Sequence, residues 1–307
     1  MLLSKKLLKT SIINRLIKNY LSFIPLLFIY YFITITLSEN VLNGDEGRYI
    51  QFSENLLNGF FANPDLKPGF LWCGPGYPII LLPFTLLKAK LVYIKLFNSL
   101  ILFLGVIFFY KSLSLNLTYK KSVLLSYIVG LTHPYFLRAI TLVHTEAFSF
   151  FLICLSLYLF QMFYKFKSRK FLMLFGLSSG LLILTKIFFS YVFLTLGVMS
   201  IILFVISKHK NKITPFLKLS FSPFIVCIPY LFYTYSITGK IFYWSDAGGS
   251  SLYSMSTPFE DEYGDWFPAS ESFFYSPKSV NIRNQKSSIK NERIIFLKSL
   301  DKLNGIE

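Results

Sequence analysis

The chain has 307 residues, of which 54% are hydrophobic, 19% aromatic and 15% charged, with a formal net charge of +16 and a mean hydropathy of +0.54. Its 35 phenylalanines and 20 tyrosines are too many for the core of one water-soluble domain, which excludes that class. Nucleic-acid binding is excluded as well, because the cations lie in short clusters between apolar runs, as in the cytoplasmic loops of membrane proteins. We expect an all-α polytopic membrane protein.

Seven apolar runs approach the length of about 20 residues that crosses a bilayer. They cover residues 20–38, 92–110, 122–137, 146–164, 171–184, 187–206 and 216–236, the third and fifth being short. Cations precede the first run, which is long and lacks a small-residue cleavage site, so we expect a retained signal anchor. The segment 78–90 is short and carries Pro78 and Pro83, which favours an interfacial or re-entrant helix.

The distribution of lysine and arginine predicts the orientation of these runs. Four regions contain cations and no acids: residues 1–19, 111–121, 165–170 and 207–213. All four lie on one side if the N-terminus is cytoplasmic and the seven runs span alternately. Residues 39–91 then form the first outer loop of a membrane domain that covers residues 1–236. We expect residues 237–307 to be an extracytoplasmic segment that is incomplete.

The cysteines and the overall composition bear on the compartment. Cys73, Cys154 and Cys227 have no paired spacing, so we expect neither a disulfide framework nor a zinc site. The lack of disulfides and the abundance of Phe, Ile, Lys and Asn are typical of a bacterial inner membrane protein.

The stretch VLNGDEGRYIQF follows the first apolar run and places two acids and an arginine in a few residues. From Asp45 the pattern predicts an amphipathic helix on the outer membrane surface, with an apolar stripe of Tyr49, Phe52 and Leu56. Asp45, Glu46 and Arg48 would lie in its first turn. Alternatively, Asp45 or Asn43 caps the helix and Arg48 only contacts solvent or lipid phosphate.

Further polar residues fall on the same side of the predicted membrane. Glu146 is the only acid between Asp65 and Asp246 and begins a span, which makes it a functional candidate, although a headgroup position favoured by the helix dipole is the alternative. Lys186 interrupts apolar sequence and is a second functional candidate. Alternatively, its side chain snorkels toward the lipid headgroups. His144 and His133 lie near an outer turn, and for both we favour a plain structural position.

The order of a hydrophobic span, DEGRY, an amphipathic helix and GPGYP at 74–78 resembles the GT-C membrane glycosyltransferases. It looks most like the group that contains the protein O-mannosyltransferases and the aminoarabinose transferases of lipid A. HTEAF at 144–148, LTK at 184–186 and the segment 238–258 are similar to later motifs of that group. Together these segments extend over most of the chain.

The resemblance implies a GT-C-like helix bundle that moves a sugar from a polyprenyl-phosphate donor to a hydroxyl of a lipid, glycan or protein acceptor. It implies Asp45 as the general base, supported by the acids Glu46 and Glu146. Arg48 and Lys186 would hold the donor phosphate. The resemblance further implies substrate contacts by Tyr49, His144 and Tyr253.

Two departures from that group matter for the predicted site. The aminoarabinose transferases carry Glu-Lys-Pro where this chain reads Trp72-Cys73-Gly74-Pro75, which leaves the presence of a divalent metal ion open. Relatives in that group are also usually longer.

Other hypotheses stay open at this stage. A polytopic transporter or flippase would need charges or broken helices at mid-membrane, often in repeated halves. An inactive, truncated membrane scaffold is a third alternative. In the outer segment, Tyr243, Trp244 and Trp266 could stack on sugars, but we favour an interfacial anchor for each.

Overall fold

The computed structural model describes residues 20–42, 44–62, 71–132 and 134–245, and every regular element in these ranges is a helix. The first half of the chain contains α2 (Ile24–Leu37), α3 (Glu46–Leu57), α4 (Gly76–Leu86), α5 (Leu91–Leu113), α6 (Tyr119–Thr132) and α7 (Pro134–Ala139). The second half contains α8 (Glu146–Phe166), α9 (Arg169–Thr185), α10 (Phe188–Ile206) and α11 (Lys210–Thr238). The prediction of an all-α protein is confirmed for this part of the chain.

Four of the helices, α5, α8, α10 and α11, are long and apolar enough to cross a membrane. Each of the seven predicted runs falls on a helix, but α2 has 14 residues, α6 has 14 and α9 has 17. The predicted short helix over 78–90 is present as α4. Large apolar side chains are exposed on the outside, among them Phe32 at 69% and Val205 at 70%, as expected for surfaces that face lipid.

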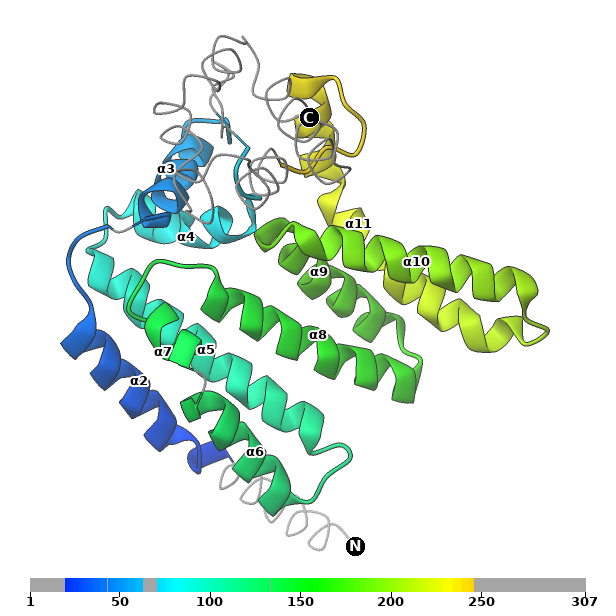
Figure 1. Cartoon of the computed structure of the whole chain (residues 1–307), viewed down its shortest axis with the longest axis horizontal. Coiled ribbons are helices and arrows are strands. Elements are labelled where there is room, and N and C mark those ends of the chain that lie inside the picture. The colour runs from blue at the N-terminus through cyan, green and yellow to red at the C-terminus, as the bar shows by residue number, and fades with distance from the viewer. Residues whose placement is uncertain (1–19, 43, 63–70, 133, 246–307) are drawn as a thin grey trace, which may run out of the picture.

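The long helices pack side by side in one layer (Figure 1). In that layer α2 and α8 pack against α5, α9 packs against α8, and α11 packs against both α9 and α10. The α9–α11 contact depends on small residues, as is common between membrane helices. A Cβ on Gly180 would lie 2.8 Å from the carbonyl oxygen of Pro223, so a larger residue would push the helices apart.

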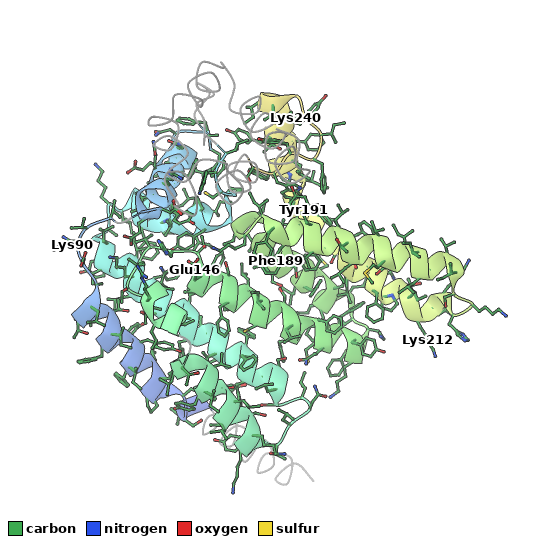
Figure 2. The ribbon with its side chains drawn as sticks, in the orientation of Figure 1. Lys90, Glu146, Phe189, Tyr191, Lys212 and Lys240 are labelled. Atoms are coloured by element: carbon green, nitrogen blue, oxygen red, sulfur yellow. The ribbon has the colours of Figure 1, made fainter. Side chains whose placement is uncertain are left out.

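The two ends of this layer differ in charge. The α5–α6, α8–α9 and α10–α11 turns lie at one end and carry the predicted cation-rich loops; Lys212 marks this end in Figure 2. The other end, where α8 begins at Glu146, is covered by α3 and α4 (Figures 1 and 2). We call this the acidic end, because Asp45, Glu46 and Glu146 all lie there.

The apolar stripe predicted for residues 45–56 is confirmed and attaches α3 to the rest of the protein. Phe52 is 8% exposed and stacks on Phe61 at a centroid distance of 4.7 Å, within a core that includes Tyr230 and Trp244. Trp244 is only 2% exposed, and its carbonyl oxygen accepts a hydrogen bond from the Tyr230 hydroxyl at 2.6 Å. The expectation of an interfacial anchor at Trp244 is therefore wrong: the residue is part of the core.

Candidate functional site

The turn that contains Gly74 and Gly76 fixes the acidic end of α9. A Cβ on Gly74 would lie 2.1 Å from the carbonyl oxygen of Leu184, and one on Gly76 would lie 2.4 Å from the hydroxyl of Thr185. Only glycine permits this approach of backbone to backbone. The GPGYP and LTK segments, more than 100 residues apart in sequence, are thereby in direct contact, and Lys186 follows at the C-terminal end of α9.

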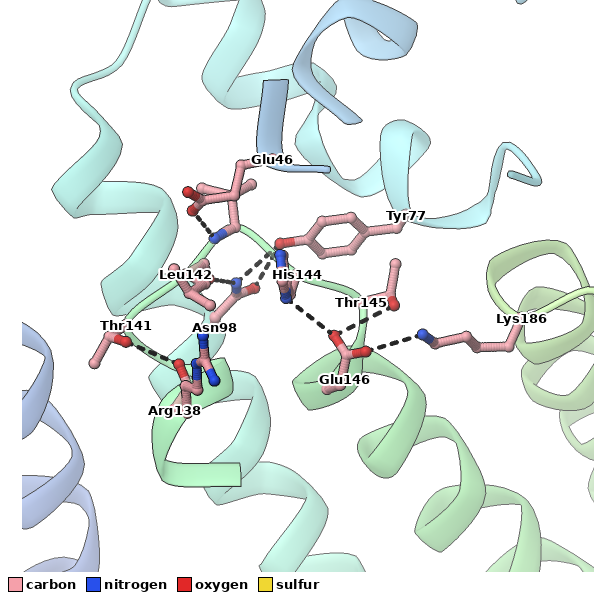
Figure 3. Close-up of polar contacts among 11 residues, drawn as sticks. Glu46, Tyr77, Asn98, Arg138, Thr141, Leu142, His144, Thr145, Glu146 and Lys186 are labelled. Carbon is pink, nitrogen blue, oxygen red and sulfur yellow. Dashed lines mark hydrogen bonds and ion pairs between the residues drawn. The ribbon is translucent and has the colours of Figure 1, made fainter. Parts of the chain in front are cut away.

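Glu146 and Lys186 form an ion pair, with Nζ of the lysine donating to Oε1 of the glutamate at 3.0 Å (Figure 3). The second carboxylate oxygen lies 3.8 Å from Nδ1 of His144 and 3.5 Å from the hydroxyl of Thr145. The Lys186 and Glu146 side chains are 32% and 18% exposed, so solvent still reaches the pair. The structure brings Glu146, Lys186 and His144 together, as predicted from the sequence.

Asp45 and Arg48 form a second pair on the first turn of α3. The Arg48 guanidinium lies 3.6 Å from Oδ1 of Asp45 and 4.9 Å from the centre of the Trp72 ring. Asp45 occupies the N-cap position, but its carboxylate makes no capping hydrogen bond. Its side chain is 46% exposed, so the carboxylate and the cation are both available to a ligand.

Tyr49 lies between the two pairs. Its ring centroid is 6.4 Å from that of His144 and 5.4 Å from that of Tyr77, both in edge-on contact. Burial raises the pKa of the Tyr49 hydroxyl above its usual value; Cys73, Asp45 and Glu146 raise it further, and a hydrogen bond with Thr145 lowers it. The phenol therefore stays protonated at neutral pH. Tyr49 lies one helical turn after Asp45 and contacts His144, whose Nδ1 is 3.8 Å from Glu146, so the ring connects the two pairs.

Glu46 is placed differently from its neighbour Asp45. Its side chain is fully buried, and its Oε1 accepts a hydrogen bond from the backbone N–H of Val143 at 2.5 Å and lies 3.8 Å from Nζ of Lys95. The lysine also donates to the carbonyl oxygen of Glu39 at 2.7 Å. A carboxylate buried in these contacts connects elements of the fold, so the geometry gives Glu46 no position beside Asp45 in a shared reaction centre.

The sequence interpretation missed Lys95, Asn98 and Tyr77. Asn98 is fully buried, donates from Nδ2 to the carbonyl oxygen of Leu142 at 2.9 Å, and bonds the Tyr77 hydroxyl through Oδ1 at 3.0 Å (Figure 3). A signal was present: Lys95, Asn98 and Ser99 stand at i, i+3 and i+4 within an apolar run, which places them on one helix face. Polar residues grouped this way in a membrane helix mark an internal contact.

Four residues named from the sequence lie outside the described residues: Asn43, His133, Tyr253 and Trp266. Within the described ranges no group of three or more His, Cys, Asp or Glu side chains could hold a metal ion. The described part of the chain therefore offers no ligand set for the divalent ion that the resemblance left open.

The chain matches no protein-family model, no curated protein and no solved structure. The site combines two carboxylates, two cations, a histidine and a protonated phenol at one end of a bundle of apolar helices. Such a set can bind an anionic headgroup, abstract a proton and donate hydrogen bonds to hydroxyl groups.

Proposed function

We propose that this protein is an integral membrane glycosyltransferase with a GT-C-like bundle of seven spans, which moves a sugar from a polyprenyl-phosphate donor to an acceptor hydroxyl. In this proposal it is a multi-pass protein of the bacterial inner membrane with a cytoplasmic N-terminus. The acidic end faces the outer leaflet, where the donor headgroup lies. The acceptor is a lipid, a glycan or a protein.

The observation that carries the proposal is that Tyr49, one helical turn after Asp45, contacts His144 beside the Glu146–Lys186 pair, at the end opposite the cation-rich turns. Lysine-rich and arginine-rich turns favour the cytoplasmic side, which supports an outer location for the acidic end. Carboxylates that are partly exposed beside cations suit a substrate with both a hydroxyl and a phosphate. An inactive membrane scaffold would need neither the exposed carboxylates nor the cations beside them.

The proposed reaction begins with donor binding. The phosphate competes with Asp45 for Arg48, because it accepts stronger charge-assisted hydrogen bonds than a partly exposed carboxylate at 3.6 Å. Lys186 donates to the phosphate while it stays paired with Glu146, since an ammonium has three donors. Arg48 and Lys186 then offset the negative charge that develops on the leaving group. His144 and Tyr49 are placed to donate hydrogen bonds to the sugar or the acceptor.

Transfer follows by direct displacement. Asp45, released from Arg48, takes the proton of the acceptor hydroxyl as its oxygen attacks the anomeric carbon. The bond from that carbon to the phosphate oxygen breaks, and the phosphate leaves with the electron pair. Attack from the face opposite the phosphate inverts the anomeric centre. Glu146 holds Lys186 and positions the acceptor.

A transporter or flippase is supported less well by the described helices. Within the bundle the polar contacts between α8 and α9 are neutral, such as Ser156 with Ser178 at 2.9 Å. The charged contact between Glu46 and Lys95 lies at the acidic end, near the start of α5. Charges at mid-membrane would favour transport instead.

The proposal is tested by reconstituting the purified chain in phospholipid vesicles with a lipid extract that contains polyprenyl-phosphate sugars. Membranes from the same cells supply the acceptor. Mass spectrometry of the lipids should show loss of the sugar-linked lipid and formation of free polyprenyl phosphate. Unchanged donor lipids after prolonged incubation, in all extracts tried, would rule out this activity.

Arg48→Ala is expected to raise the apparent KM for the lipid donor by about 10- to 100-fold, because a hydrogen bond to a charged group contributes roughly 1.5–3 kcal/mol. Arg48→Lys should fall between that variant and the wild type, since an ammonium keeps the charge but not the planar fork. Lys90→Ala is the matched control, an exposed cation at the same end. An unchanged KM in Arg48→Ala would remove Arg48 from the phosphate site.

A further inference from the structure

The first turns of α5 carry three polar side chains on one face. Lys95 is 1% exposed, and Asn98 and Ser99 are fully buried. None of them takes part in the reaction proposed above. Burying a lysine at the start of a membrane helix is costly unless its contacts compensate, so its position needs an explanation.

Two of these side chains, Lys95 and Asn98, each hold two segments of the acidic end. Lys95 bonds the carbonyl oxygen of Glu39, after α2, and pairs with Glu46 at the start of α3. Asn98 bonds the carbonyl oxygen of Leu142, before α8, and the hydroxyl of Tyr77 in α4. One face of α5 therefore contacts four separate pieces of chain.

Glu46 closes the connection between α3 and α8. Its Oε1 accepts the N–H of Val143, which lies one residue from the Leu142 that Asn98 holds. Asp45 is the residue before Glu46, and Glu146 is the third residue after Val143. Asp45 and Glu146 thus lie within four residues of a buried contact to α5, Asp45 beside Glu46 and Glu146 four residues after Leu142.

We propose that Lys95, Glu46 and Asn98 form a positioning clamp that sets the separation between Asp45 on α3 and Glu146 on α8. The catalytic role of this clamp rests on the proposed function, whereas the positioning of α3 relative to α8 does not. A buried ion pair contributes little net stability compared with apolar residues of the same size. It does select one arrangement, because moving α3 relative to α5 would separate Lys95 from Glu46 and leave each buried charge without its counter-charge.

The clamp is tested by the distance between spin labels on Gln51→Cys in α3 and Thr141→Cys in the loop before α8. The full chain carries Cys73→Ser, and the buried Cys154 and Cys227 are kept. Pulsed electron resonance should give one narrow distance distribution in this protein, and a shifted or clearly broader one when Lys95→Met is added. Glu46→Gln, which keeps the volume and an oxygen acceptor, serves as a milder second variant and decides the test if Lys95→Met does not fold.

Gly197→Val is the matched control for a general loss of stability. A Cβ at Gly197 would lie 2.8 Å from the Phe221 ring, so valine there disturbs the packing between α10 and α11. This contact lies away from the acidic end. We expect the label distance to be unchanged in this variant. Unaltered distances in both clamp variants, or equal broadening in all three, would overturn the proposal.

Kinetics separate the clamp from the proposed function. Glu46→Gln should lower kcat for sugar transfer by about 10²-fold with little change in the donor KM, since misplacement by about 1 Å can cost that much and the phosphate-binding cations remain. If the wild type transfers no sugar and the label distance still broadens, the clamp stands and the glycosyltransferase proposal fails. A normal kcat in an active protein whose label distances have changed would refute the clamp's catalytic role.

Discussion

Asp45→Asn is expected to abolish most sugar transfer, lowering kcat by about 10²–10⁴-fold, the contribution of a positioned general base. The asparagine keeps the size of the side chain and can still hydrogen-bond the acceptor, but it takes no proton. Stability should change little. Asp45 is 46% exposed, and its contact with Arg48 spans three residues of one helix, a geometry worth only about 0.3–0.5 kcal/mol.

The activity of Asp45→Asn is measured as polyprenyl phosphate released per minute at saturating donor, in the vesicle assay described above. Glu54→Gln provides the matched control, because Glu54 is an exposed acid on the same helix. It should retain wild-type activity. A rate for Asp45→Asn close to that of the control would show that the base lies elsewhere, and Glu146 would then be the next residue to replace.

Lys95→Met is expected to produce the largest loss of stability among single substitutions at the acidic end, about 3–5 kcal/mol, the range for removing one partner of a buried ion pair. Methionine fills a similar volume, so the lost stability comes from removing the charge and not from a cavity. The Glu46 carboxylate keeps its bond from Val143 but loses the cation at 3.8 Å. The free energy of unfolding is measured by titrating the detergent-solubilised protein with SDS.

The double variant Lys95→Met with Glu46→Gln distinguishes the ion pair from a general packing defect. Both charges are then absent, and the glutamine oxygen can still accept the Val143 N–H, so we expect the double variant to regain much of the lost stability. Lys90→Met, an exposed lysine shortly before α5, should cost little. A loss below about 1 kcal/mol for Lys95→Met would match an exposed pair and contradict the burial described here.

The helices could be predicted from the sequence because apolar length and local pattern largely determine them. The run 187–206 corresponds to α10 at Phe188–Ile206, and the amphipathic pattern after Asp45 corresponds to α3. Glu146 and Lys186 could be named because an acid and a lysine in apolar sequence are conspicuous. Their 3.0 Å contact could be expected only as a convergence of outer loops, since no spacing rule relates positions 40 residues apart.

The different environments of Asp45 and Glu46 could not be predicted from the DEGRY motif. Adjacent side chains on a helix point about 100° apart, so one faces solvent and the other faces α5. Which of them is buried depends on the docking of α3, and that docking depends on Phe52 and on contacts with residues far along the chain. Lys95 was missed for the same reason: its partners, Glu39 and Glu46, precede it by about 50 residues.

The side of the membrane on which the acidic end lies is tested most directly by cysteine labelling in intact spheroplasts. Asn40→Cys lies at the acidic end and Asn116→Cys in the α5–α6 turn; both positions are exposed, and both variants carry Cys73→Ser. A membrane-impermeant maleimide should label position 40 in intact cells and position 116 only after lysis. Labelling of position 116 in intact cells, with position 40 protected until lysis, would place the two carboxylates in the cytoplasm and contradict the proposed use of an outer-leaflet donor.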